Sequence, residues 1–237
     1  MTTIWVYLAT SPLLGLLLTL TVYIGASSLY RRTGGFPLAQ PVLLSVAAIA
    51  TLLELAHIPY PTYFEGAQFV HFLLGPATVA LAVPLFQNVA RIRRAAPSIA
   101  AGLLCGAITA TVSAIAIGRA FGASDVVLRS LAPKSVTAPI AMGISEKVGG
   151  LPSLTAALVI LTGITGAMLF PLVFEWTRIG DWRARGLGVG TAAHGIGTAR
   201  ALMLDGTAGA FSSLAMGLNA FVSSVLVPPL LYLMLGR

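Results

Sequence analysis

Long apolar runs follow one another along the chain, and short polar segments separate them. The clearest runs span residues 4–29, 38–56, 98–118, 152–175 and 208–235. A helix needs about 20 apolar residues to cross the hydrocarbon of a bilayer. Each run is therefore expected to be a transmembrane helix, and the pattern as a whole predicts an all-α polytopic membrane protein.

Three further apolar stretches, 69–89, 124–149 and 186–204, contain residues that interrupt a helix. The interrupting positions are Pro76, Pro84, Pro133, Pro139, Gly190 and Gly197. Proline removes a backbone donor and clashes with the preceding turn, and glycine loosens a helix. Such backbone occurs at membrane depth only where protein buries it or water reaches it. We therefore expect these stretches to be broken or re-entrant helices.

The basic residues predict the topology. They gather in three short loops, at 31–32, 91–94 and 178–185. Short basic loops face the cytoplasm, which makes 57–68 an outer loop. The second and third basic loops both face the cytoplasm only if 124–149 enters and leaves on the outer side. By the same logic, 186–204 enters from the cytoplasmic side. The alternative is a full crossing by both stretches, which breaks the charge rule at 178–185.

An internal spacing of 57 residues accompanies these breaks. The pairs with this spacing are Pro76 with Pro133, Gly106 with Gly163, and Pro171 with Pro228. In each unit a broken segment precedes an intact helix, and units with an odd number of crossings come out inverted. Inverted repeats with broken helices are typical of secondary transporters.

We expect a single membrane transport domain over residues 1–237. It comprises an N-terminal helix pair at 1–68 and a broken-helix core at 69–237, with about six to eight transmembrane segments. Two or three of these would be broken or re-entrant.

Composition supports this class. Hydrophobic residues make up 57% and charged residues only 9%, whereas soluble proteins have about 25% charged residues. The net charge of +7 is explained by the cytoplasmic loops and not by nucleic-acid binding. The single cysteine, Cys105, excludes a disulfide within the chain.

Common catalytic, nucleotide and metal patterns are not found in the sequence. We see no Ser-His-Asp set, Cys-x-x-Cys, Walker loop or H-E-x-x-H, so we expect neither an enzyme nor a cofactor. Four acidic and histidine residues of the outer loop region match no metal-ligand spacing. They are interpreted as the solvated mouth of the protein at its outer side. They are Glu54, His57, Glu65 and His71.

The stretch LAPKSVTAPIA, residues 131–141, places Lys134 near mid-membrane, where a charge costs about 2.5–3.5 kcal/mol on insertion scales. Ser135 and Thr137 add hydroxyls, and a half-helix starting here would direct amide donors at an anion. The stretch is therefore a candidate cradle for a carboxylate or phosphate. In the alternative interpretation, Lys134 reaches a lipid headgroup or pairs with Asp125 or Glu146.

A second stretch, GTAAHGIGTARAL at 190–202, combines hydroxyls with Arg200 and His194. Arginine can hold a carboxylate through two hydrogen bonds, and histidine titrates near neutral pH. His194 is the first candidate for proton coupling. Glu146 is the second, unless it forms a surface ion pair with Lys147. A dinucleotide loop at the glycines is excluded, because no strand precedes them, and loose helix packing is their alternative role.

Two weaker polar features complete the pattern. Thr78, Gln87 and Asn88 carry no charge and are expected to shape a cavity rather than bind strongly. Asn219 lies alone in an apolar run and is expected to form hydrogen bonds across helices.

At the two stretches quoted above, the sequence resembles the LrgB/CidB family of bacterial membrane proteins, and the resemblance extends over essentially the whole chain. That family is similar to the membrane portion of the plant plastid glycolate/glycerate translocator. The resemblance implies transport of small 2-hydroxy or 2-keto monocarboxylates such as glycolate, glycerate, pyruvate or lactate. The family has also been described as antiholin-like, acting with a small LrgA/CidA-type partner on murein hydrolase activity and lysis.

We therefore expect a secondary carrier or facilitator for a small carboxylate in the bacterial cytoplasmic membrane, with a dimer as the expected assembly. Lys134 and Arg200 would hold the carboxylate, and nearby hydroxyls would bind the other oxygen. The expected binding residues are Lys134, Ser135, Thr137, Thr191, His194, Gly195, Thr198 and Arg200. The alternative is an antiholin- or holin-like regulator of lysis.

Overall fold

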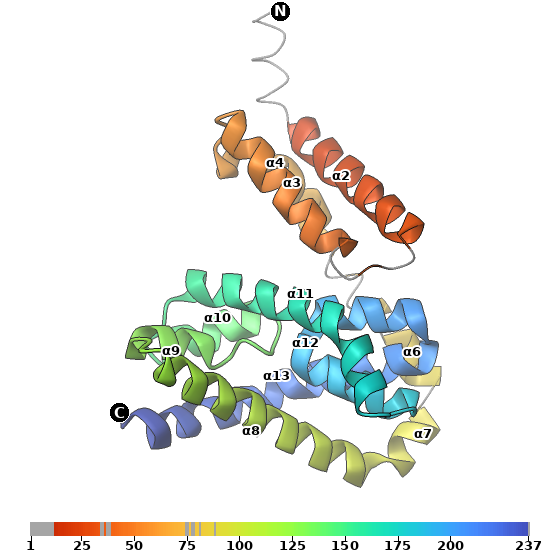
Figure 1. Cartoon of the computed structure of the whole chain (residues 1–237), viewed down its shortest axis with the longest axis vertical. Coiled ribbons are helices and arrows are strands. Elements are labelled where there is room, and N and C mark those ends of the chain that lie inside the picture. Colours follow the sequence, from red (N-terminus) through yellow and green to blue (C-terminus); the bar gives the residue numbers. More distant parts are fainter. Residues whose placement is uncertain are drawn as a thin grey trace, which may run out of the picture. The chain divides into compact units, whose positions relative to one another are not determined.

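The computed structural model describes most of the chain, and every regular element in the described residues is a helix (Figure 1). The described residues are 12–33, 36, 39–73, 76, 79–80, 82–87 and 89–236. The chain divides into two compact units, Met1–Ala80 and Leu81–Arg237. Each unit is described by itself.

The first unit contains α2 (Pro12–Arg32), α3 (Pro41–Leu55) and α4 (Tyr60–Phe72), with α2 packed against both others. Gly15 lets α2 approach α4 closely, since a Cβ there would collide with the Tyr63 carbonyl oxygen.

The expectation of a loop at 57–68 is wrong, because α4 covers most of it. The prolines of this segment, Pro59 and Pro61, fall at the start of the helix, where a missing N–H group leaves no bond unmade. The Tyr63 amide donates to the Pro59 carbonyl at 3.3 Å and closes the first turn.

The second unit carries the remaining helices. They are α6 (Ala82–Gln87), α7 (Val89–Arg94), α8 (Ala96–Ala120), α9 (Asp125–Leu131), α10 (Ala138–Lys147), α11 (Pro152–Trp176), α12 (Trp182–Leu204) and α13 (Gly206–Leu235).

Four helices of the described chain are long and apolar enough to cross a membrane. They are Leu13–Arg32, Ala96–Ala120, Pro152–Trp176 and Gly206–Leu235. The fifth expected span is the 15-residue α3, which at about 1.5 Å per residue is shorter than a typical hydrocarbon core. These helices confirm the polytopic membrane fold.

Residues 124–149 form a helical hairpin and not a crossing. The helices α9 and α10 have seven and 10 residues, so neither spans more than about 15 Å. Pro133 lies in the break between them, and Pro139 lies in the first turn of α10. Both helices lie at the end of the unit where α8 ends and α11 begins (Figure 1). The re-entrant interpretation is therefore confirmed.

The second broken segment is α12, and its break is at His194. The backbone there has φ 40° and ψ −134°, which no helix accommodates. The expectation that Gly190 and Gly197 break the helix is wrong. Both lie in helical backbone, where they allow close packing: Gly190 lies against the Ser212 carbonyl, and Gly197 lies against Val189.

Contacts between α12 and α13 show that α12 reverses its direction at His194. In order along α12, they join Gly186 to Ala208, Gly190 to Ser212, Thr198 to Ser212, and Leu202 to Gly209. The partner positions on α13 advance before His194 and retreat after it. Therefore α12 enters and leaves at the same end of the unit, as a second hairpin.

The two hairpins are related by the spacing that the sequence predicted. Their first residues, Asp125 and Trp182, are 57 positions apart, and so are their last residues, Lys147 and Leu204. One of the four membrane-length helices follows each hairpin. The 25-residue α11, about 38 Å long, separates the ends at which they enter. The hairpins thus enter from opposite ends, as an inverted repeat requires.

The first repeat of the pattern is only partly described. Pro84 lies in the first turn of the short α6, and Pro76 has neighbours outside the described residues. Thr78 and Asn88 also lie outside them.

Candidate functional site

The tips of the two hairpins meet at Asn219 of α13. Its side-chain Nδ2 donates to the Ser135 carbonyl at 3.2 Å and to the Thr191 carbonyl at 3.0 Å. Ser223 Oγ donates to Asn219 Oδ1 at 3.2 Å, and Asn219 is 1% exposed. The expected hydrogen bonding of Asn219 across helices is confirmed, and it satisfies one carbonyl from each hairpin.

Lys134 lies at the tip of the first hairpin. Its amide donates to the Leu131 carbonyl at 3.1 Å, and its half-buried side chain donates from Nζ to Ser135 Oγ at 3.3 Å. Within the described residues the one ion pair joins Arg183 to Asp181, so Lys134 is not paired with Asp125 or Glu146.

Thr137 begins α10 at this tip. Its backbone is extended, with φ −61° and ψ 145°, and its hydroxyl makes no capping hydrogen bond. The first amides of a helix lack partners within that helix, so the α10 amides point towards the tip. A cation, a hydroxyl and amide donors therefore gather within a few residues.

His194 forms the tip of the second hairpin. Its Nε2 lies 2.9 Å from the Val159 carbonyl of α11. Gly163 of α11 makes room for the ring, since a Cβ there would lie 2.6 Å from His194 Cε1. The Asn219 bridge joins Ser135, the residue after Lys134, to Thr191, which lies three residues before His194. The two hairpins thus bring a cation and a titratable ring near each other.

Hydroxyls line the second hairpin behind its tip. Thr198 Oγ1 donates to the His194 carbonyl at 2.7 Å and lies 2.8 Å from Ser212 Oγ. Thr191 Oγ1 donates to the Leu187 carbonyl at 2.8 Å. Both side chains are buried, and their hydroxyls are already bonded within the protein. In this structure the hydroxyls of the site are therefore occupied by hydrogen bonds within the protein.

Three of the expected site residues lie at the edge of this cluster or outside it. Gly195 adjoins the tip and faces Met216. Arg200 is partly buried on the returning half of α12, six residues past His194, which is about 9 Å along a helix. Glu146 is exposed near the end of α10, at the base of its hairpin. That Arg200 and Lys134 hold one carboxylate stays a prediction, and so does coupling through Glu146.

Sequence reasoning missed a buried hydroxyl cluster that anchors the first hairpin. Thr155 Oγ1 of α11 lies 2.9 Å from the Ser130 carbonyl of α9 and donates to Ser145 Oγ of α10 at 2.7 Å. Ser130 Oγ accepts from the Leu151 amide at 2.8 Å. These three hydroxyl residues are 0% exposed. Their polarity within apolar segments was the only signal in the sequence.

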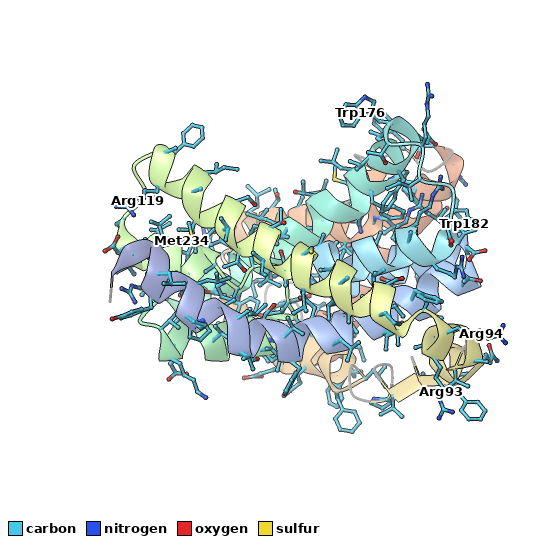
Figure 2. All side chains as sticks on the ribbon, turned by 90° about the horizontal axis from the view of Figure 1, so that it is seen from below. Arg93, Arg94, Arg119, Trp176, Trp182 and Met234 are labelled. Atoms are coloured by element: carbon cyan, nitrogen blue, oxygen red, sulfur yellow. The ribbon has the colours of Figure 1, made fainter. Side chains whose placement is uncertain are left out.

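Arginines close two helix ends on the side where the first hairpin enters. Arg129 Nη1 donates to the Val148 carbonyl after α10 at 2.8 Å. Arg119 Nη1 donates to the Met234 carbonyl near the end of α13 at 2.8 Å, and Figure 2 shows the two side by side. Cations favour the carbonyl end of a helix, so these arginines have a structural role.

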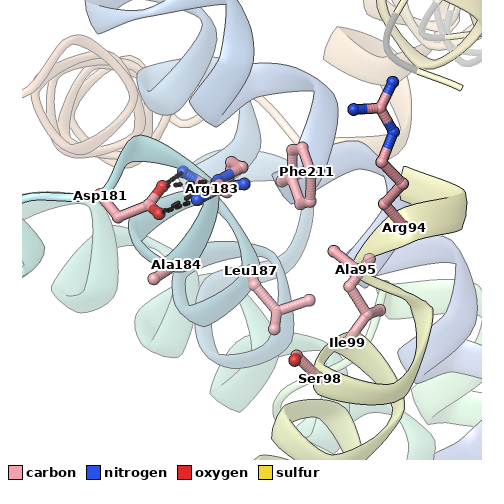
Figure 3. Close-up of a pocket in the computed structure, with 9 residues that line it drawn as sticks. All are labelled: Arg94, Ala95, Ser98, Ile99, Asp181, Arg183, Ala184, Leu187 and Phe211. Carbon is pink, nitrogen blue, oxygen red and sulfur yellow. Dashed lines mark hydrogen bonds and ion pairs between the residues drawn. The ribbon is translucent and has the colours of Figure 1, made fainter. Parts of the chain in front are cut away.

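A cavity of about 520 Å³ opens at the opposite end of the unit, and sequence reasoning missed it (Figure 3). Its lining comes from the starts of α8, α12 and α13 and the end of α7: Arg94, Ala95, Ser98, Ile99, Asp181, Arg183, Ala184, Leu187 and Phe211. The Arg183 guanidinium donates to both Asp181 oxygens and lowers the pKa of that carboxyl to about 2. This pair is therefore charged at every physiological pH.

The comparisons with known proteins agree over nearly the full length. The LrgB-like family pattern matches residues 19–233. The chain is 38% identical to the uncharacterized protein YwbG of Bacillus subtilis over 224 residues, covering 94% of this chain and 98% of YwbG. It is 34% identical to the holin-like protein CidB of Staphylococcus aureus over 221 residues, covering 93% of this chain and 96% of CidB.

No solved structure matches the chain. The family match, the relatives and the four membrane-length helices together establish a multi-pass bacterial membrane protein. The chain belongs to the LrgB-like family.

Proposed function

We propose that the protein is a secondary transporter or facilitator of small monocarboxylate anions of the glycolate, glycerate, pyruvate or lactate type. The observation that carries this proposal is Lys134, a cation at a re-entrant tip with no acidic partner in the described chain. A buried charge without a counter-ion is costly. An anionic substrate would supply that counter-ion.

The chemistry of the tips fits a short hydroxy- or keto-acid. The carboxylate would bind Lys134 and the first amides of α10, with the Thr137 hydroxyl beside them. The hydroxyl or keto oxygen would bind a hydroxyl of the second hairpin, Thr191 or Thr198. Arg200, about 9 Å along α12 from the tip, would contact the anion on its way to or from the cytoplasm.

The arrangement also suits alternating access. The hairpins enter from opposite ends, and Asn219 joins their tips by two hydrogen bonds. Each such bond contributes only about 0.5–1.5 kcal/mol net, so a substrate that replaces them can separate the tips. Access from either side then follows from which hairpin moves away from α13.

His194 is the proposed coupling residue, because it lies at the junction of the tips and near Lys134. Protonation of its ring would add a positive charge beside the bound anion. Uptake of the anion together with a proton would follow from that attraction.

The test is uptake of radiolabelled glycolate and pyruvate into proteoliposomes. Lys134→Ala should reduce the initial rate by at least about tenfold, the effect of losing a charge-assisted contact of about 1.5–3 kcal/mol. Lys147→Ala is the matched control, because Lys147 is exposed at the base of the same hairpin. It should transport like the parent. An inward proton gradient should accelerate the parent but not His194→Gln.

Folded Lys134→Ala protein that transports like the parent would contradict the site. The same vesicles also test the alternative function, a holin-like regulator of lysis, which the name of the CidB relatives favours. That function, exerted together with a small LrgA/CidA-type partner, predicts leakage of uncharged solutes instead of saturable acid uptake. A homodimer is the proposed assembly for either function.

A further inference from the structure

The cavity at the arginine-rich end of the second unit lies on the cytoplasmic side. Arg91, Arg93 and Arg94 precede α8 at this end, and three further arginines, Arg178, Arg183 and Arg185, surround the turn into α12. Figure 2 shows Arg93, Arg94 and Trp182 at this end and Arg119 at the other. An excess of short-loop arginines marks the cytoplasmic face.

The floor of this cavity is apolar, although its rim is charged. Three helices each supply one side chain to the floor: Ile99 from α8, Leu187 from α12 and Phe211 from α13. Arg94, Asp181 and Arg183 are exposed and form the rim, and Figure 3 shows Arg94 and Asp181 on opposite sides of Phe211. Phe211 is 1% exposed and is the largest fully buried side chain among the residues that the structure describes. An anion that enters the cavity therefore meets apolar side chains at its deepest part.

The hairpin tips lie behind this floor. Ser212, the residue after Phe211, is hydrogen-bonded to Thr198 of the second hairpin. Asn219, which holds both tips, is eight residues past Phe211 along α13, or about 12 Å at helical rise. The stretch Gly206–Ala215 consists of small residues apart from Phe211 and Leu214. The buried hydroxyls of Thr198 and Ser212 therefore follow directly behind the apolar floor of the cavity.

We infer that this cavity is the cytoplasmic vestibule of the transport pathway and that Ile99, Leu187 and Phe211 form its gate. The inference rests on the proposed function for the identity of the passing anion. Arg94 raises the local concentration of anions, while Asp181 neutralises Arg183. The apolar floor excludes a hydrated charge, because entry would strip its water without replacement.

Two of the gate residues lie on the same helices as the second hairpin tip and Asn219. Leu187 lies on the entering half of α12, and Phe211 lies on α13, where Gly186 and Gly190 bring the two backbones into contact. Any movement that separates the α12 hairpin from α13 therefore opens the floor as well. Opening of the tip and opening of the gate are one motion.

A thiol reporter behind the floor tests the gate without any substrate. In a Cys105→Ser background, Thr198→Cys places a thiol at a position that is 1% exposed. Inside-out vesicles are treated with a membrane-impermeant maleimide, and the labelling rate is measured. Phe211→Ala should accelerate labelling by about tenfold, because it removes the largest side chain of the floor and leaves a cavity.

Two controls make this result specific. Phe221→Ala is the same substitution on the same helix at a side chain that is 73% exposed, and it should leave the Thr198→Cys rate unchanged. A thiol at Ser98, which lines the vestibule above the floor, should react at one rate in all backgrounds. Leu187→Ala removes a side chain that α12 contributes to the same floor. It replaces Phe211→Ala in the test if that variant does not fold.

Equal Thr198→Cys labelling in the Phe211→Ala, Leu187→Ala and Phe221→Ala proteins would overturn the gate. Because labelling needs no transported acid, its outcome is independent of the uptake assay. A gated thiol without acid uptake would reject the proposed substrate and keep the vestibule. Acid uptake together with equal labelling rates in all variants would keep the proposed substrate and reject the gate.

Discussion

Asn219 holds both hairpin tips through a single amide group. Its two donated hydrogen bonds end on backbone carbonyls that belong to different repeats, and Ser223 orients the amide from one turn further along α13. Buried carbonyls at a helix break need a donor. In an otherwise apolar environment, this side chain supplies one to each break.

Replacing Asn219 should therefore destabilise the second unit. Asn219→Ala leaves the Ser135 and Thr191 carbonyls without this donor, and we expect a loss of about 1–3 kcal/mol of unfolding free energy. Thermal unfolding in detergent measures the effect as a lowered midpoint. Ser224→Ala on the same helix is the control, since Ser224 is exposed and its hydroxyl bonds only within α13. Equal midpoints for the two variants would rule out the bridging role of Asn219.

Hydroxyl groups attach each hairpin to its neighbouring helix. Thr155 of α11 fixes both arms of the first hairpin. Ser212 of α13 contacts the returning arm of the second hairpin through Thr198. Hydroxyl contacts of this kind hold a segment at membrane depth without the desolvation cost of an ion pair.

Thr155→Val keeps the shape of the side chain and removes its hydroxyl. Ser145 then loses its buried partner, and we expect about 1–3 kcal/mol of destabilisation. Faster hydrogen exchange should appear in residues 125–147 and not throughout the unit. Thr177→Val, at the exposed end of the same helix, should change neither quantity. Exchange that accelerates uniformly would show that the cluster does not anchor the hairpin.

At the scale of elements, the sequence predicted a helix break correctly where a proline and the charges of the flanking loops marked it. Pro133 and the basic loops on either side predicted the first hairpin correctly. The second break was misplaced, because glycines usually mark breaks, whereas Gly190 and Gly197 serve close packing and the bend falls on His194. The helix at 60–72 was missed, since its starting prolines resemble loop residues.

Tertiary features had little or no signal in the sequence. The vestibule is lined by residues from 94–99, 181–187 and position 211, and only the packing of three helix starts brings them together. Phe211 is an ordinary apolar residue until its small neighbours and the cavity are seen. Asn219 was predicted to bond across helices because an amide in an apolar run must find partners. Which partners it finds depended on the fold.

At the scale of the whole molecule, the architecture of the second unit accounts for the positions of most of its arginines. Six arginines lie at the end where the second hairpin enters, while Arg119 and Arg129 at the other end bond helix carbonyls. Two hairpins that enter from opposite ends and meet at one asparagine form an inverted repeat around a central site. That plan is typical of secondary transporters.

The most direct test of this account is a map of which side of the membrane each hairpin base faces. Single cysteines at four exposed positions, Asp125, Lys147, Ala184 and Leu204, are introduced into the Cys105→Ser protein and labelled from each side. The account predicts that the bases of the first hairpin react only from outside and those of the second only from the cytoplasm. Labelling of the two bases of either hairpin from opposite sides would show a full crossing and contradict it.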